Sequence, residues 1–215
     1  ALLAYGVRAR DAVSLCALAM PEAVYLLYAI NKIGAIANML VMNATEAEIH
    51  EKLAVTKSKV VITVDLALEK IVQASRETSV KHIIGVSLAE SMPCVIGTLY
   101  KWKSKVKKEN CILFSEFLKA GQGKKIDCQE IKGDAPAVIA YTGGTTGKAK
   151  GVLLSNRAAN AIAFQYKYAD KVLDFQNGER FLDIIPPFLA YGLFFGVHMA
   201  LCTCLEDVLC PDPAP

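Results

Sequence analysis

Strong net charge and clustered metal ligands are both missing from this sequence. The 215 residues carry 24 Lys and Arg against 21 Asp and Glu, for a formal net charge of +3, which is too small to indicate a nucleic-acid partner. The seven cysteines form no C-x-x-C pair, and His50, His82 and His198 lie far apart in the chain. We therefore expect no metal site, and we interpret the cysteines as buried, reduced thiols of a cytoplasmic protein.

Formal charge is also absent from residues 184–205, if His198 is neutral. A stretch of this length meets the criterion for a membrane-spanning helix. Two prolines near its start, at positions 186 and 187, and the internal Gly192 and Gly196 instead favour a strand, a turn and a buried helix. We predict no membrane span.

What the chain does contain is an alternation of strand-like and helix-like segments. Helix starts are predicted at Pro21, at the capping box formed by Thr45 and Glu48, near Leu66 and at Ser155. Strand candidates are the short apolar runs at residues 12–18, 35–42, 59–64, 81–86, 135–140 and 181–185. Such alternation is typical of a parallel sheet covered on both faces. The sequence therefore predicts an α/β protein, a layered α/β/α fold with a mainly parallel sheet.

The most distinctive stretch is residues 141–151, Tyr-Thr-Gly-Gly-Thr-Thr-Gly-Lys-Ala-Lys-Gly. Its glycines and threonines offer N–H groups and hydroxyls that can surround a polyphosphate, and Lys148 and Lys150 add positive charge. The same residue types also make ordinary solvated hairpin loops. A Walker-type loop is excluded, because Thr142 replaces its first glycine, Ala149 replaces its Ser or Thr, and a strand-like run replaces its helix.

This stretch resembles the phosphate-loop signature of the adenylate-forming enzymes, which include acyl- and aryl-CoA synthetases, luciferases and peptide-synthetase adenylation domains. All eleven positions fit, with Ala149 as the less usual choice where proline is common. The resemblance implies that the loop holds the β- and γ-phosphates of ATP while a carboxylate attacks the α-phosphorus. The implied ATP-binding residues are Thr142, Gly143, Gly144, Thr145, Thr146, Gly147 and Lys150. Thr146 and Lys150 would be the catalytic ones.

A second resemblance lies in residues 186–192, Pro-Pro-Phe-Leu-Ala-Tyr-Gly. The family has a similar segment here, which lines the acyl pocket and often contains a histidine. Phe188, Tyr191 and Gly192 match it, and with Leu189 they are the implied substrate-binding residues. Peptide-synthetase domains keep an Asp at the place of Leu189 to pair with their substrate's amino group. Leucine at this place disfavours an amino acid as the substrate.

By the same resemblance, the chain corresponds to the first half of the family's large N-terminal domain. Residues 20–172 would form one α/β subdomain with the phosphate loop, and residues 1–19 and 173–215 would begin a second one with the acyl-pocket segment. The family's later motifs, for adenine, magnesium, ribose and the lysine of the C-terminal domain, do not occur in these residues. We therefore expect a piece of a longer enzyme that is inactive by itself.

The resemblance implies a ligase that uses ATP to activate a small-molecule carboxylic acid. It would make an acyl-adenylate and pyrophosphate and then transfer the acyl group to CoA, as an acyl-CoA synthetase of fatty acid metabolism does. ATP, magnesium and CoA are the implied cofactors. Three alternatives remain open at this point: an amino-acid adenylation domain, a generic nucleotide-binding module, and a non-catalytic α/β scaffold.

Overall fold

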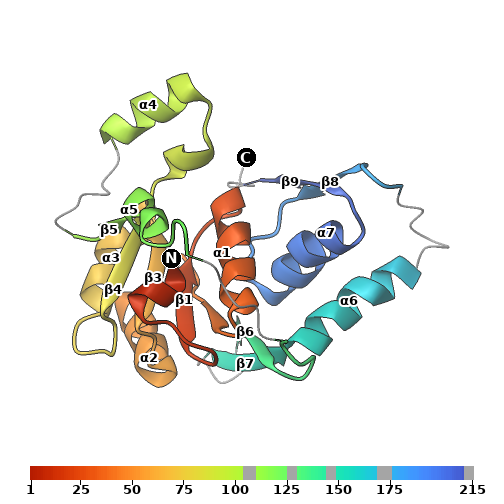
Figure 1. Ribbon diagram of the computed structural model, residues 1–215, viewed down its shortest axis with the longest axis horizontal. Coiled ribbons are helices and arrows are strands. Elements are labelled where there is room, and N and C mark those ends of the chain that lie inside the picture. Colours follow the sequence, from red (N-terminus) through yellow and green to blue (C-terminus); the bar gives the residue numbers. More distant parts are fainter. Residues whose placement is uncertain (104–109, 125–129, 144–148, 169–175, 211–215) are drawn as a thin grey trace.

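A seven-stranded sheet forms the centre of the computed structural model, which describes residues 1–103, 110–124, 130–143, 149–168 and 176–210 (Figure 1). The strand order is β5-β4-β3-β1-β2-β6-β7. All neighbours pair in parallel except β6 and β7, which form an antiparallel hairpin. The strands are β1 (Ala12–Cys16), β2 (Ile36–Met39), β3 (Val60–Val64), β4 (His82–Val86), β5 (Ile112–Leu113), β6 (Pro136–Thr142) and β7 (Lys150–Ser155).

Helices cover both faces of this sheet. Apolar residues of α1 and α5 pack with one set of strand side chains, and those of α2 and α3 pack with the opposite set. The predicted α/β/α layering with a mainly parallel sheet is therefore confirmed. The α-helices of this part are α1 (Pro21–Lys32), α2 (Glu46–Thr56), α3 (Leu68–Ala74), α4 (Cys94–Lys103) and α5 (Phe114–Lys119), with short 3-10 turns η1 (Leu2–Tyr5), η2 (Asp65–Ala67) and η3 (Leu88–Ser91).

Local sequence signals begin the helices where they were predicted. Pro21 is the first residue of α1. At the start of α2, the Thr45 N–H donates to Glu48 Oε2 over 2.7 Å, and the Glu48 N–H donates to Thr45 Oγ1 over 3.3 Å. These two bonds satisfy backbone donors that a helix start otherwise leaves free. At the start of α6 (Asn156–Tyr168), Ser155 Oγ accepts from the Ala158 N–H over 3.2 Å.

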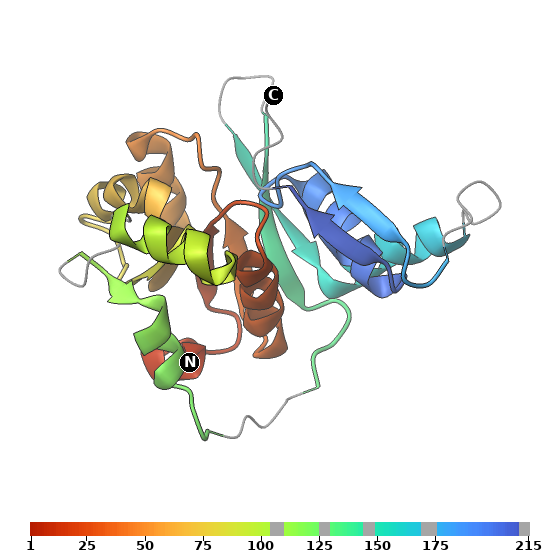
Figure 2. The same cartoon turned by 90° about the horizontal axis from the view of Figure 1, so that it is seen from above.

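The chain leaves the sheet after β7 and builds a second, smaller group of elements. Figure 2 shows the β6–β7 hairpin between this group and the helices α1–α3. The group contains α6, the π-helix η5 (Gly192–Met199), α7 (Ala200–Cys202) and a parallel pair of strands, β8 (Arg180–Asp183) and β9 (Glu206–Leu209). Its small core includes Ala163, Met199, Ala200 and Leu205.

The first strand does not lie where the family resemblance placed it. Residues 1–19 were expected to begin the second subdomain, together with residues 173–215. Instead, β1 lies inside the seven-stranded sheet, between β2 and β3. Its apolar side chains explain this position, because Val13, Leu15 and Cys16 are all at most 1% exposed and need helices on both faces of the strand. The division near residue 172 falls outside the described residues.

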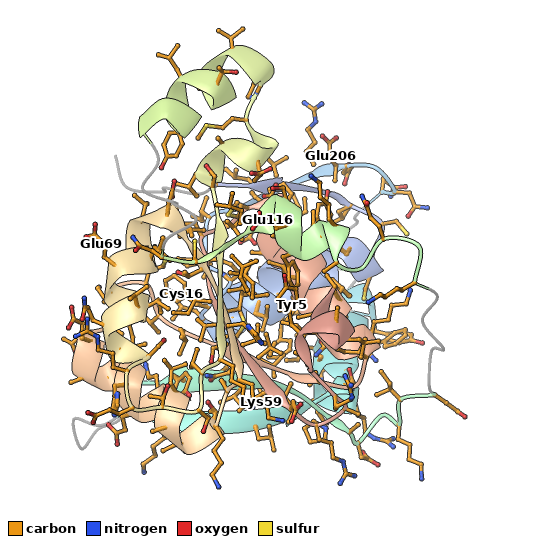
Figure 3. All side chains as sticks on the ribbon, turned by 60° about the vertical axis from the view of Figure 1, so that its left-hand side comes forward. Tyr5, Cys16, Lys59, Glu69, Glu116 and Glu206 are labelled. Atoms are coloured by element: carbon orange, nitrogen blue, oxygen red, sulfur yellow. The ribbon has the colours of Figure 1, made fainter. Side chains whose placement is uncertain are left out.

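The uncharged stretch at residues 184–205 forms the predicted turn and buried helix. Gly192, Leu193, Phe194, Gly196, Val197 and Met199 of η5 are buried. Among the helices that the structure describes, none combines the length and apolar character that crossing a bilayer requires. The cysteines whose side chains are described are free thiols, but Cys202 and Cys204 are exposed, so the expectation that the thiols are buried is wrong for these two. Cys16 lies in the interior (Figure 3), where burial raises its pKa to about 11.

Candidate active site

The glycine-rich loop joins the two strands of the β6–β7 hairpin. Tyr141 pairs with Gly151, and Thr142 pairs with Lys150. The two ends of the motif are thus held together by the ladder. Thr142, Gly143, Ala149 and Lys150 are exposed, and a Cβ placed on Gly143 would meet no atom of the described residues within 4 Å. The loop's other implied ATP-binding residues, Gly144, Thr145, Thr146 and Gly147, lie outside the described residues.

The loop begins at the carboxyl end of β6, which runs parallel to β2. In open α/β sheets, ligands bind beyond the carboxyl ends of the parallel strands. The Lys150 ammonium has no ion-pair partner in the part of the chain that the structure describes. Exposed backbone, a hydroxyl residue and this lysine therefore meet at the edge where an anionic ligand is expected.

Gly151 has a packing role that the sequence did not reveal. A Cβ on Gly151 would lie 3.1 Å from Tyr141 Cε1 and 3.2 Å from Ile139 Cγ2. The glycine lets the Tyr141 ring lie across the neighbouring strand. The Tyr141 hydroxyl then donates to Asn38 Oδ1 over 2.8 Å. Burial raises the pKa of Tyr141 to about 12, so the phenol stays protonated as a donor at neutral pH.

Gly192, in the second predicted segment, is required by a close backbone approach. A Cβ there would overlap the carbonyl oxygens of Ile185 and Pro186. The chain turns at these residues and the helix that follows packs directly against the turn, because the Leu193 N–H donates to the Leu189 carbonyl and the Leu189 N–H donates to the Pro186 carbonyl.

An apolar hollow of about 330 Å³ lies between α6 and the helix that carries Tyr191. Three aromatic rings are part of its lining: the Phe195 ring centroid is 4.4 Å from that of Tyr166 and 4.9 Å from that of Tyr191. Among the described residues, no Asp, Glu, Lys or Arg lines it. The lining residues are Leu154, Ala158, Ile162, Tyr166, Ala190, Tyr191, Phe194 and Phe195.

Only one of the four predicted substrate-binding residues lines this hollow. Tyr191 does, whereas Phe188 packs against the core of the large sheet and Leu189 is 40% exposed outside it. The sequence analysis did not predict that residues of α6 line this hollow. Ala158, Ile162 and Tyr166 recur every four residues, a spacing that places them on one helix face and could have identified them.

The chain matches a described protein family over its whole length. The match to the family described as "AMP-binding enzyme" covers residues 1–215. A long-chain-fatty-acid–CoA ligase of Bacillus subtilis is 28% identical over 98% of this chain and 39% of its own length. A 4-coumarate–CoA ligase of Humulus lupulus is 28% identical over 87% of this chain and 31% of its own length. The chain therefore spans less than half the length of these curated relatives.

Solved structures share the fold at lower sequence identity. The anthranilate CoA ligase AuaEII, in complex with anthranoyl-AMP, superposes with a TM-score of 0.82 at 20% identity, over 98% of this chain and 37% of that one. The N-terminal domain of FACL13 from Mycobacterium tuberculosis gives 0.72 at 19% identity, over 98% of this chain and 46% of that one. The expected N-terminal-domain fold of an adenylate-forming enzyme is thus confirmed, and the chain belongs to the AMP-binding enzyme family.

Proposed function

We propose that the protein carrying this chain activates a carboxylic acid with ATP, forming an acyl-adenylate and releasing pyrophosphate, and then transfers the acyl group to CoA. The observation that carries the proposal is the eleven-residue loop motif, whose ends are paired at the carboxyl edge of a parallel sheet. Relatives named as CoA ligases support it. A generic nucleotide-binding module and a non-catalytic scaffold are the less well supported hypotheses, because neither function requires the particular residues of this motif.

The exposed residues at the two ends of the loop, Thr142, Gly143 and Lys150, can bind phosphate groups. The Gly143 N–H and the Thr142 hydroxyl can donate hydrogen bonds, and the Lys150 ammonium can offset negative charge. We assign the same roles to Thr145, Thr146 and the remaining loop glycines. Positive charge and fixed donors act on the charge that grows on the phosphates as the carboxylate attacks the α-phosphorus. Alignment of the two reactants supplies the rest, without a covalent bond to the enzyme.

Magnesium and CoA belong to the proposed reaction, but the described residues offer them different support. No group of three or more His, Cys, Asp or Glu in the described part of the chain could hold a metal ion. The described residues therefore do not fit a protein-held magnesium site, and we derive no step through one. The proposal for CoA as the acceptor rests on the named relatives.

The substrate we propose is a fatty or aryl carboxylic acid with no charged group besides its carboxylate, bound in the apolar hollow between α6 and η5. Its volume, about 330 Å³, is in the range of small-molecule sites. Burying the ammonium group of an amino acid there, with no acidic side chain among the described lining residues to pair with it, would cost several kcal/mol, roughly a thousandfold in affinity. Phe188, Leu189 and Gly192 do not line the hollow, so Tyr191 is the one of the four expected residues that contacts the acid in this proposal.

ATP–pyrophosphate exchange by the intact enzyme tests both parts of the proposal. With a panel of fatty, aryl and amino acids, we expect exchange to be strongest with a fatty or an aryl acid. If an amino acid is best, the substrate assignment falls while the ligase assignment stands. If none of the acids in the panel supports exchange, the ligase assignment is wrong.

Two matched substitutions locate the acyl site. Ala158→Phe fills the hollow and should shorten the longest acid accepted, whereas Leu189→Trp, outside the hollow, should not. The reverse result would move the acyl site to the segment around Leu189. We also propose that the 215-residue chain alone shows only background exchange, because it spans 39% of the length of the Bacillus subtilis relative.

A further inference from the structure

Polar side chains cross the interior of the sheet and lead to Tyr141, the first residue of the loop motif. Ser14 on β1 and Asn38 on β2 are both 0% exposed, although strands covered on both faces are usually apolar. Asn38 Nδ2 donates to Ser14 Oγ over 2.7 Å, and Ser14 Oγ donates to Ser58 Oγ over 2.8 Å. Thr56 Oγ1 lies 2.9 Å from Ser58 Oγ. Every one of these side chains therefore has a hydrogen-bond partner, which buried polar groups require.

Tyr141, the first residue of the loop motif, is the outer end of this network. Its hydroxyl donates to Oδ1, the side-chain acceptor atom of Asn38, over 2.8 Å. Its ring is contacted on one face by Lys52 of α2, whose Nζ lies 4.3 Å from the ring centroid. Lys52 is only 9% exposed, and a cation in this position is attracted by the ring. The phenol is thus held both at its hydroxyl and at its ring.

A groove of about 490 Å³ separates α2 from the hairpin, and its lining includes Lys52, Val55, Tyr141, Gly151 and Leu153. Val55 and Leu153 are 77% and 56% exposed, so apolar packing does not close the gap. The contacts of the Tyr141 side chain therefore bear directly on where Thr142 and Gly143 lie.

We propose that Asn38 and Lys52 are positioning residues for Thr142 and Gly143, acting through Tyr141, so that these first residues of the phosphate loop are already placed for ATP before it binds. This inference rests on the proposed function and adds the residues that orient its ATP site. A site that is organised in advance pays less ordering cost when ligand binds. Loosening Tyr141 should then weaken ATP binding and leave the acid site untouched.

The test uses the intact enzyme and two minimal variants. Tyr141→Phe removes only the hydroxyl, and Lys52→Met removes the cation while keeping an unbranched apolar side chain. In each, we expect the Kd for ATP by calorimetry and the KM for ATP in the exchange assay to rise about tenfold. The KM for the acid should stay within about twofold of the wild-type value.

Two controls separate positioning from general stability. Lys52→Arg keeps a cation over the ring and should restore the ATP affinity to within about twofold. Ser58→Ala removes a buried member of the network that does not contact Tyr141, and it should lower the melting temperature without changing the KM for ATP.

The inference is overturned if Tyr141→Phe lowers the melting temperature and leaves ATP affinity unchanged, or if Ser58→Ala weakens ATP binding as much as Tyr141→Phe does. The binding measurement also keeps this inference separate from the ligase proposal. If the wild-type enzyme binds ATP but none of the acids supports pyrophosphate exchange, the proposed reaction is wrong. The positioning role would then be judged from the Kd values alone.

Discussion

Replacing Asp207 with asparagine should stabilise the protein at pH 8 and not at pH 4. Asp207 on β9 pairs with Phe181 on β8, and Asp183 lies two residues further along β8 on the same face. Asp183 is 2% exposed. Asp183 Oδ2 and Asp207 Oδ1 are buried without a hydrogen-bond partner among the described residues. Burial, and then repulsion from Asp183, raises the pKa of Asp207 to about 7.

The sign of the effect follows from proton binding. An unfolded aspartate releases its proton near pH 4, whereas the folded Asp207 keeps it until about pH 7. Between these values the folded state binds more protons, so the free energy of unfolding falls as the pH rises from about 4 to about 7 and then stays constant. A shift of about three units corresponds to roughly 4 kcal/mol at most. Since Asp207 is only partly buried and shares its site with Asp183, about 1–2 kcal/mol is the expected loss.

Asparagine has nearly the same shape as the protonated acid but cannot ionise. The melting temperature of Asp207→Asn should therefore match the wild type at pH 4 and exceed it by about 2–8 °C at pH 8. Glu206→Gln is the matched control, because Glu206 precedes Asp207 on β9 but lies at the edge of the molecule (Figure 3), where it pairs with Arg180 over 3.1 Å. That exposed pair should be worth under about 1 kcal/mol. A loss of stability in Asp207→Asn at pH 8 would refute the assigned repulsion.

Three further predictions concern the caps, the glycines and the loop. Thr45→Ala should cost about 1 kcal/mol in chemical denaturation because it removes the capping box, whereas Thr45→Ser should restore it. Gly192→Ala should cost about 1–3 kcal/mol, since a Cβ would overlap backbone carbonyls, while Gly143→Ala, where a Cβ meets no described atom, should leave the melting temperature unchanged. In the intact enzyme, Lys150→Ala should slow adenylate formation at least tenfold in stopped-flow measurements, and an unchanged rate would remove Lys150 from the mechanism.

The parts of the fold that could be predicted from the sequence depend on neighbours in the chain. The capping box at Thr45, the proline at the start of α1 and the loop between two strands are all written within a few residues. Strand order is different, because it is decided by which apolar faces need covering. The strand at residues 12–16 is central in the sheet since its side chains are buried on both faces, a property that its own sequence shares with strands at other positions.

The candidate site also has a part that the local sequence predicts and a part that depends on distant residues. The loop motif identifies itself because its residues are contiguous, but the reason for its tyrosine is not local. Tyr141 needs Asn38, 103 residues earlier, and Lys52 on a separate helix, and no spacing rule connects the three. The hollow beside Tyr191 is also shared between elements, with one side supplied by α6.

The polar residues of the sheet show why such distant pairings can still be inferred in part. A serine at position 14 and an asparagine at position 38, each inside a run of buried apolar residues, would each cost roughly 1–3 kcal/mol if left unpaired. A strand that keeps such a residue must therefore place a partner beside it. The sequence reveals the need for a partner, and only the parallel register, in which Ser14 lies opposite Asn38, identifies which residue it is. The same reasoning extends to Tyr141, whose hydroxyl donates to Oδ1 of Asn38 and so gives the side-chain oxygen of this buried residue a partner.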